Sequence, residues 1–216
     1  MEKKTLVRIV PNPKNKAVRI LLLDDSRADA DLIEHELERS EIDVVLERVD
    51  SEASFTAALD TFAPDVVLSD HALAEFSSQA ALETLRAICP ATAFIIMTRA
   101  QLGGMTSASI RAGADDVVVK TNLGGLAASI SHALDVRRPL GALSTRQVEV
   151  LKLVAEGYRT RDIANRLGLR VKTVESHRYA LMKRLHLDSV VGLVRFAIRV
   201  GLIPLDPGSL EHQSSA

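Results

Sequence analysis

Polar side chains follow four of the five strands that the sequence predicts, each at the point where its strand ends. They are Asp24 and Asp25, then Asp70, Thr98 and Lys120. Three carboxylates at one sheet edge repel one another and need a cation, and oxygen ligands without His or Cys favour Mg²⁺ over zinc. The metal and the lysine would neutralise a phosphoryl group carried by one carboxylate, and the hydroxyl could bond a phosphoryl oxygen.

The elements that must position these side chains form an alternating series. The predicted strands are Val18–Leu23, Ile42–Val49, Asp65–Ser69, Ala93–Met97 and Asp116–Val119. The predicted helices are Asp29–Arg39, Ser51–Thr61, Gln79–Ile88, Met105–Ala112 and Leu123–Arg137. This alternation predicts an α/β fold, a doubly wound five-stranded parallel sheet with right-handed crossovers. Ligands of such sheets bind at the carboxyl ends of the strands.

A second pattern lies in the stretch Arg159–Leu185, which indicates two short helices with a turn at Gly168. Apolar residues recur at helical spacing in both helices. The opposite face of the second helix carries Lys172, Glu175, Ser176, Tyr179 and Lys183. A helix of this kind suits insertion into a DNA major groove. The spacing alone is equally compatible with an amphipathic helical hairpin that has a solvated polar face.

The segment Ala17–Arg137, with its acidic and basic residues at the strand ends, resembles the receiver domain of response regulators, which has a flavodoxin-like fold. The resemblance implies that Asp70 is the phosphoacceptor. It assigns Mg²⁺ to Asp24, Asp25, Asp70 and the backbone carbonyl of Ala72. It makes Thr98 the switch hydroxyl and Lys120 the cation that pairs with the phosphoryl group.

The segment Ser144–Ile203 resembles the LuxR-type helix-turn-helix domain of NarL/FixJ-type response regulators, a small all-α domain. The resemblance rests on Glu149-Val150-Leu151, Ala155-Glu156-Gly157, Ile163-Ala164, Leu167-Gly168-Leu169, Lys172-Thr173-Val174, His177-Arg178 and Lys183-Arg184-Leu185. It implies a recognition helix over residues 171–185. The implied DNA-binding residues are Arg170, Lys172, Thr173, Glu175, Ser176, His177, Arg178, Tyr179 and Lys183. Of these, we expect the arginines and lysines at phosphates and Glu175, Ser176 and Tyr179 at base edges. His177 could either touch a phosphate or brace the turn.

Several positions depart from the receiver pattern. Leu73-Ala74 stands where the family usually has Met-Pro, and Arg99 replaces the small residue that usually follows the switch hydroxyl. Val117 replaces an aromatic residue that normally moves with that hydroxyl. His71 is unusual beside the phosphoacceptor, and we interpret it as a solvated or packing residue. The ligands are intact and the transmission residues are altered, which predicts phosphorylation with modified coupling or lifetime.

The charge distribution supports two functional halves. Residues 17–138 carry 10 basic and 20 acidic side chains, whereas residues 139–216 carry 12 basic and 7 acidic ones, so the second half is the one that approaches a polyanion. We expect an N-terminal extension (1–16), a receiver domain (17–137), a linker (138–143), a helix-turn-helix domain (144–203) and a C-terminal tail (204–216). No apolar run is long enough to span a membrane, and a single cysteine, Cys89, fits the cytoplasm.

These observations predict a transcriptional regulator of a two-component system. Mg²⁺-dependent phosphorylation of Asp70 by a sensor histidine kinase would control its binding to double-stranded DNA as a homodimer. The resemblance to the LuxR-type domain implies that the last helix, Ser189–Val200, is the dimer contact. The alternative is a regulator of the same architecture that works without phosphorylation. A Mg²⁺-dependent phosphotransfer enzyme is disfavoured because such enzymes use an Asp-x-Asp pair after the first strand, and this chain has Asp24-Asp25-Ser26. We therefore do not expect an enzyme.

Overall fold

The computed structural model describes residues 7–8, 17–40, 42–73, 76–99 and 103–203. The chain divides into two compact units. Unit 1 comprises residues 1–110 and 114–137, and unit 2 comprises residues 111–113 and 138–216. None of the helices in the described ranges is both long and apolar enough to cross a membrane.

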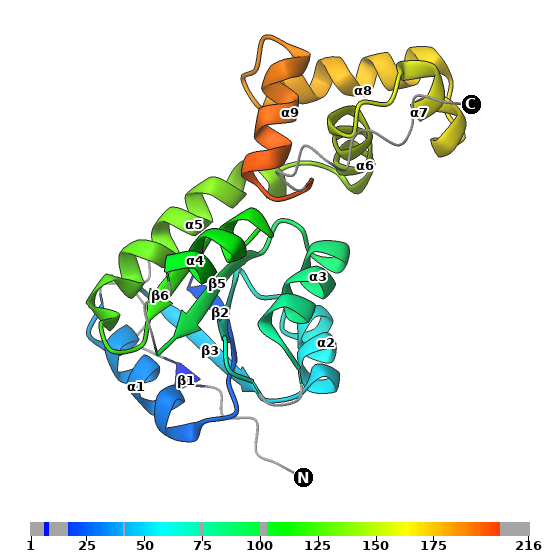
Figure 1. Cartoon of the computed structure of the whole chain (residues 1–216). Coiled ribbons are helices and arrows are strands. Elements are labelled where there is room, and N and C mark those ends of the chain that lie inside the picture. Colours follow the sequence, from blue (N-terminus) through cyan, green and yellow to red (C-terminus); the bar gives the residue numbers. More distant parts are fainter. Residues whose placement is uncertain (1–6, 9–16, 41, 74–75, 100–102, 204–216) are drawn as a thin grey trace. The chain divides into compact units, whose positions relative to one another are not determined.

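Unit 1 is built on a six-stranded sheet with the order β1-β3-β2-β4-β5-β6 (Figure 1). The strands are β1 (Val7–Arg8), β2 (Val18–Leu23), β3 (Val44–Val49), β4 (Val66–Asp70), β5 (Ala93–Thr98) and β6 (Asp116–Val119). Strands β2 to β6 pair in parallel, which confirms the predicted doubly wound sheet. The sequence did not lead us to expect the sixth strand: β1, from the predicted extension, pairs antiparallel with β3 at the sheet edge.

Helices cover both faces of this sheet. They are α1 (Arg27–Glu38), α2 (Glu52–Thr61), α3 (Ser78–Ile88), α4 (Gly103–Arg111), the 3₁₀ turn η1 (Leu123–Gly125) and α5 (Leu126–Gly141). One core joins the sheet to α1 and α5, and a second core joins it to α2 and α3. Strands β4 and β5 are buried along their whole length, as continuous apolar runs require when both faces are covered.

Side-chain caps start several of these helices. Ser51 forms the expected cap of α2: its hydroxyl accepts from the Ser54 backbone N–H, and its own backbone N–H donates to the Ser54 hydroxyl. Ser26 caps α1, whose first residue is Arg27, so the helix begins before the predicted start at Asp29. Asp29 is therefore the third residue of α1, and its backbone N–H donates to the Ser26 hydroxyl at 3.3 Å.

The structure differs from the prediction in the segment 138–143, which the sequence analysis assigned to a linker. Helix α5 continues through Pro139 and ends at Gly141, so most of the expected linker is helical. We expected the last receiver helix to end at Arg137, and α5 instead continues four residues further. The residue-level boundaries of the five segments stay predictions.

Unit 2 consists of α6 (Thr145–Ala155), α7 (Thr160–Leu167), α8 (Val171–Arg184) and α9 (Val190–Arg199) among the described residues. Ser144 and Gln147 form the expected capping box of α6. Gly168 ends α7 in the left-handed conformation, with φ 63°, and so makes the predicted turn before α8. The core contains the predicted apolar residues of the helix pair, including Ile163, Val174 and Leu181.

Candidate functional site

The expected strand-end residues meet at one edge of the sheet in unit 1. Asp24 directly follows β2, Asp70 and Thr98 are the last residues of β4 and β5, and Lys120 directly follows β6. The Lys120 backbone N–H donates to the Thr98 carbonyl at 2.6 Å. Since β2, β4, β5 and β6 are successive neighbours in the sheet, side chains far apart in sequence share this edge.

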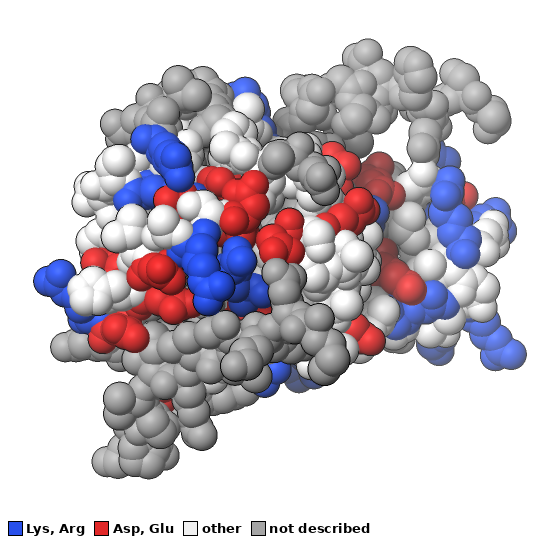
Figure 2. All heavy atoms as spheres, turned by 90° about the horizontal axis from the view of Figure 1, so that it is seen from below, with Lys and Arg blue, Asp and Glu red and all other residues white. Residues whose placement is uncertain are grey.

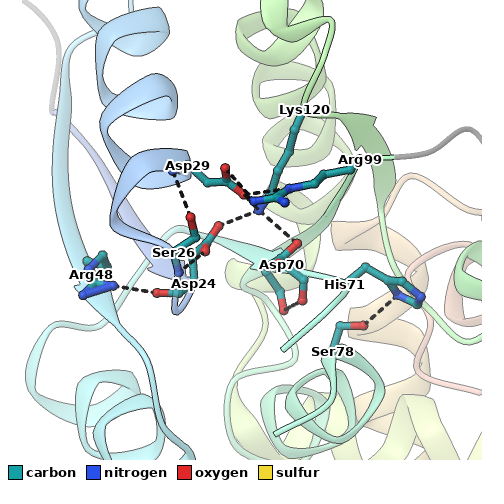
Figure 3. Close-up of polar contacts among 10 residues, drawn as sticks. Asp24, Ser26, Asp29, Arg48, Asp70, His71, Ser78, Arg99 and Lys120 are labelled. Carbon is teal, nitrogen blue, oxygen red and sulfur yellow. Dashed lines mark hydrogen bonds and ion pairs between the residues drawn. The ribbon is translucent and has the colours of Figure 1, made fainter. Parts of the chain in front are cut away.

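The Lys120 ammonium is the centre of the site (Figure 3). Its Nζ lies 2.7 Å from Asp24 Oδ2, 2.7 Å from Asp29 Oδ2 and 2.9 Å from Asp70 Oδ1. The lysine side chain is only 6% exposed, and that of Asp24 is fully buried. A buried cation thus links three buried carboxylates, an arrangement that stabilises each charge only as long as its partners remain.

Asp29 is the site residue that sequence reasoning missed. Its carboxylate also accepts from the Arg99 guanidinium, with Nη2 at 3.0 Å from Oδ1 and at 2.9 Å from Oδ2. The same Oδ2 is therefore shared by Lys120 and Arg99 (Figure 3). A rule that inspects strand ends overlooks Asp29, because the residue lies in the first turn of α1. The only signal in the sequence was the unusual cation, Arg99, which needs an anionic partner.

Burial and pairing shift the ionisation of these groups in different directions. Burial raises the pKa of Asp24, and the hydrogen bond from Lys120 offsets this only in part. Burial opposes the charge of Asp29 too, but the bonds from Lys120 and Arg99 lower its pKa below the ordinary value. Although burial disfavours the charged amine, its carboxylate partners raise the pKa of Lys120, so it stays protonated at neutral pH.

The carboxylates of Asp24, Asp25 and Asp70 fit a magnesium ion. Each offers one oxygen, and these oxygens lie within 4.8 Å of one another. Opposite ligands of octahedral Mg²⁺ lie about 4 Å apart, so small side-chain rotations suffice. Four carboxylates, including Asp29, face two cations here, so the cluster has an excess of negative charge that a hard divalent cation would balance. The Figure 2 view likewise shows acidic side chains (red) gathered around a small group of basic ones (blue).

The structure describes three of the other positions that depart from the receiver pattern, namely His71, Leu73 and Val117. His71 is exposed, in agreement with its interpretation as a solvated residue, and its Nδ1 lies 3.4 Å from the Ser78 hydroxyl. Val117 is half-buried and packs against the core formed with α2 and α3. Leu73 packs partly against the same core, whereas Ala74 lies outside the described residues.

In unit 2, helix α8 separates its apolar and polar faces as predicted. Val174 and Leu181 are buried, and Tyr179 is 67% exposed. Lys172, Glu175, Ser176 and Lys183, the other members of the predicted polar face, are exposed as well. This polar face is a continuous exposed surface on a helix that directly follows a tight turn.

The remaining predicted DNA-binding residues are placed less uniformly. Arg170 is the N-cap residue of α8, is exposed, and forms no side-chain capping hydrogen bond. Thr173, His177 and Arg178 are half-buried. Arg178 donates to the Thr160 hydroxyl of α7 at 2.6 Å and so braces the two helices against each other. The DNA-contacting roles of all nine residues stay predictions.

A doubly wound sheet whose edge carries an acidic cluster around a buried lysine, joined to a helix-turn-helix unit, defines the class of two-domain response regulators. The family described as "Response regulator receiver domain" matches residues 20–130, more than half of the chain. The family described as "Bacterial regulatory proteins, luxR family" matches residues 141–197. The chain belongs to the response regulator family and is a two-domain member of the NarL/FixJ type, with a LuxR-type DNA-binding domain.

Relatives share part of this chain. The oxygen regulatory protein NreC of Staphylococcus haemolyticus is 38% identical over 90 residues, which are 41% of this chain and 42% of NreC. The uncharacterized response regulatory protein YgeK of Escherichia coli is 43% identical over 60 residues, 28% of this chain and 41% of YgeK. The chain thus spans less than half the length of the curated relatives it matches.

Solved structures of response regulators are also similar. Full-length FixJ from B. japonicum has 21% identity and a TM-score of 0.47, over 88% of this chain and all of FixJ. RcsB from Salmonella typhimurium has 20% identity and a TM-score of 0.49, over 86% of this chain and 99% of RcsB.

Proposed function

We propose that the chain is a transcriptional regulator whose DNA binding is controlled by Mg²⁺-dependent phosphorylation of Asp70. The observation that carries this proposal is the contact between Lys120 Nζ and Asp70 Oδ1 at 2.9 Å, beside the acidic cluster of Asp24 and Asp25. A carboxylate with an adjacent fixed cation and a metal-binding cluster is suited to accept a phosphoryl group. We infer that a sensor histidine kinase is the donor and that the chain acts in the cytoplasm.

Each residue of the site has its own role in the proposed phosphoryl transfer. One oxygen of Asp70 attacks phosphorus, and the bond from phosphorus to the donor nitrogen or oxygen breaks, with its electron pair leaving on the donor. Lys120 would pair with the phosphoryl oxygens, and the Thr98 hydroxyl would donate to one of them. Asp24, Asp25, Asp70 and the Ala72 carbonyl would hold Mg²⁺, which when bound neutralises the charge that accumulates on the phosphoryl oxygens.

Phosphorylation and its consequence form the first prediction. With acetyl phosphate and Mg²⁺, the intact mass should increase by one phosphoryl group, and Asp70→Asn should remove this increase. Beryllofluoride, a phosphoryl mimic, should raise both the solution mass toward a dimer and the affinity for the operator, because paired half-sites are bound by paired recognition helices. A wild-type chain that gains neither mass nor affinity would contradict the proposal.

The polar face of α8 supports a second prediction, on DNA recognition. In gel-shift titrations, Lys172→Ala should weaken binding to all sequences alike, because a phosphate contact carries no sequence information. Glu175→Ala should relax discrimination at one base pair by about 1–3 kcal/mol, since a carboxylate can accept from a cytosine amine. Equal effects of both variants on specificity would show that this division of roles is wrong.

A phosphorylation-independent regulator of the same architecture is the second candidate. One observation favours it: all three ammonium N–H groups of Lys120 already face carboxylates of the protein. In that case the receiver domain would serve as a dimer or partner module. Operator affinity that is the same with beryllofluoride, with magnesium alone and for Asp70→Asn would identify this candidate.

A further inference from the structure

The resting partners of Lys120 leave no position for a phosphoryl oxygen. An ammonium group has three N–H donors. Those of Lys120 reach Asp24, Asp29 and Asp70 at 2.7, 2.7 and 2.9 Å, inside a site where the lysine side chain is 6% exposed. A phosphoryl group on Asp70 can therefore bind Lys120 only if one of these three carboxylates gives up its bond.

The three carboxylates differ in how easily they can leave. Asp24 is fully buried, and its other oxygen accepts from the Ser26 backbone N–H at 2.8 Å. Asp70 is the acceptor itself. Of the three, Asp29 is the carboxylate that also accepts hydrogen bonds from a second basic side chain, because Arg99 already bonds both of its oxygens. Asp29 can therefore lose Lys120 and keep a full bidentate pair with Arg99, a strong form of carboxylate recognition.

The Arg99 side chain is 70% exposed, whereas that of Asp29 is 11% exposed. The guanidinium thus reaches the site from its solvent side, and it can follow the carboxylate outward without being buried. In the exchange Lys120 pairs with a phosphoryl oxygen in place of the Asp29 carboxylate, and Asp29 remains neutralised by Arg99.

We propose that, before phosphorylation, Asp29 occupies the hydrogen-bonding position at Lys120 that a phosphoryl oxygen takes afterwards. We further propose that Arg99 holds the Asp29 carboxylate away from Lys120 once the phosphoryl group is present. Asp29 and Arg99 are then positioning residues that act through Lys120, and together they set how readily Asp70 accepts and keeps the phosphoryl group. This inference rests on the proposed phosphorylation of Asp70.

Beryllofluoride binding to the full-length chain tests the exchange. Isothermal titration calorimetry at saturating Mg²⁺ should show that Asp29→Asn binds beryllofluoride about tenfold more tightly than wild type, since a competing charge-assisted bond is gone. Arg99→Ala should bind more weakly, because Asp29 then keeps Lys120. The double variant should match Asp29→Asn, because Arg99 acts only through Asp29. Arg99→Lys should restore part of the affinity.

Matched controls separate this exchange from general charge effects. Asp31→Asn removes an exposed acid of the same helix, and Arg39→Ala removes an exposed arginine at its end, so both should bind as wild type does. Thermal unfolding reports whether each variant is folded, and Asp29→Ser serves as a second variant if Asp29→Asn is not. Weaker binding by Asp29→Asn, or independent and additive effects of Asp29→Asn and Arg99→Ala, would overturn the inference.

The two proposals fail in different ways. If the folded wild type and every variant bind no beryllofluoride, the proposed phosphorylation of Asp70 is wrong, and the inference falls with it. If the wild type binds but Asp29→Asn binds no more tightly, the exchange at Lys120 is wrong while the proposed function stands. If Arg99→Ala weakens binding equally in the Asp29→Asn background, Arg99 contacts the phosphoryl group directly and the withdrawal role is wrong.

Discussion

Replacing Lys120 with methionine should lower the free energy of unfolding of the receiver unit by about 3–5 kcal/mol in magnesium-free buffer. The variant leaves the carboxylates of Asp24, Asp29 and Asp70 buried together, with side chains that are 0%, 11% and 9% exposed. Methionine has a similar length, so loss of packing is small and the change mainly removes the compensating charge. Urea unfolding followed by circular dichroism, with EDTA present, measures the effect.

Magnesium should recover much of that loss. The ion would become the main cation of the cluster, and a ligand at one hundred times its dissociation constant stabilises the folded state by about 2.7 kcal/mol. The Lys120→Met chain should therefore depend on magnesium more steeply than the wild type does. Arg39→Met, at an exposed cation of the same unit, is the control. A loss below about 1 kcal/mol with unchanged magnesium dependence would show that Lys120 does not balance these charges.

The second large effect is expected from Asp115→Asn, which should destabilise unit 1 by about 3–5 kcal/mol. Asp115 Oδ1 accepts from Arg137 Nε at 2.8 Å. Its Oδ2 accepts from Arg86 Nη2 at 3.1 Å and from the Phe94 backbone N–H at 2.8 Å. The side chains of Asp115 and Arg137 are 3% and 2% exposed, so the asparagine variant would remove a buried carboxylate that two guanidinium groups contact.

The charge state of this network follows from its burial. Burial and the neighbouring Arg137 lower the pKa of Arg86 to about 9, which still leaves it protonated at neutral pH. Both guanidinium groups therefore need Asp115 under ordinary conditions. Urea unfolding of Asp115→Asn, compared with Asp60→Asn at an exposed position of α2, measures the effect. Equal stabilities of these two variants would show that the charge of Asp115 does not stabilise Arg86 and Arg137, which also bond the backbone carbonyls of Thr92 and Pro90.

Local rules were sufficient for most of the fold. An apolar run of the length of Val18–Leu23 is typical of a strand covered on both sides. Ser51 and Ser144 cap helices through bonds that close within three residues. The errors arose where a local rule met tertiary context. The last receiver helix was predicted to end at Arg137, although α5 continues through Pro139 to Gly141. The strand β1 was not counted in the sheet, because two residues carry no periodic signal.

The sequence by itself determined the five parallel strands and their alternation with helices and, through the rule that parallel strands end at one edge, that Asp24, Asp70, Thr98 and Lys120 would meet. It also determined which face of the recognition helix is polar, since helical spacing alone assigns Lys172, Glu175 and Tyr179 to one side. Only the tertiary structure decided how the charges pair. Asp29 and Arg99 are 70 residues apart and belong to α1 and to the end of β5, so no spacing rule connects them. Their pairing depends on the packing of α1 against the sheet, which brings a first-turn carboxylate within hydrogen-bonding distance of both cations.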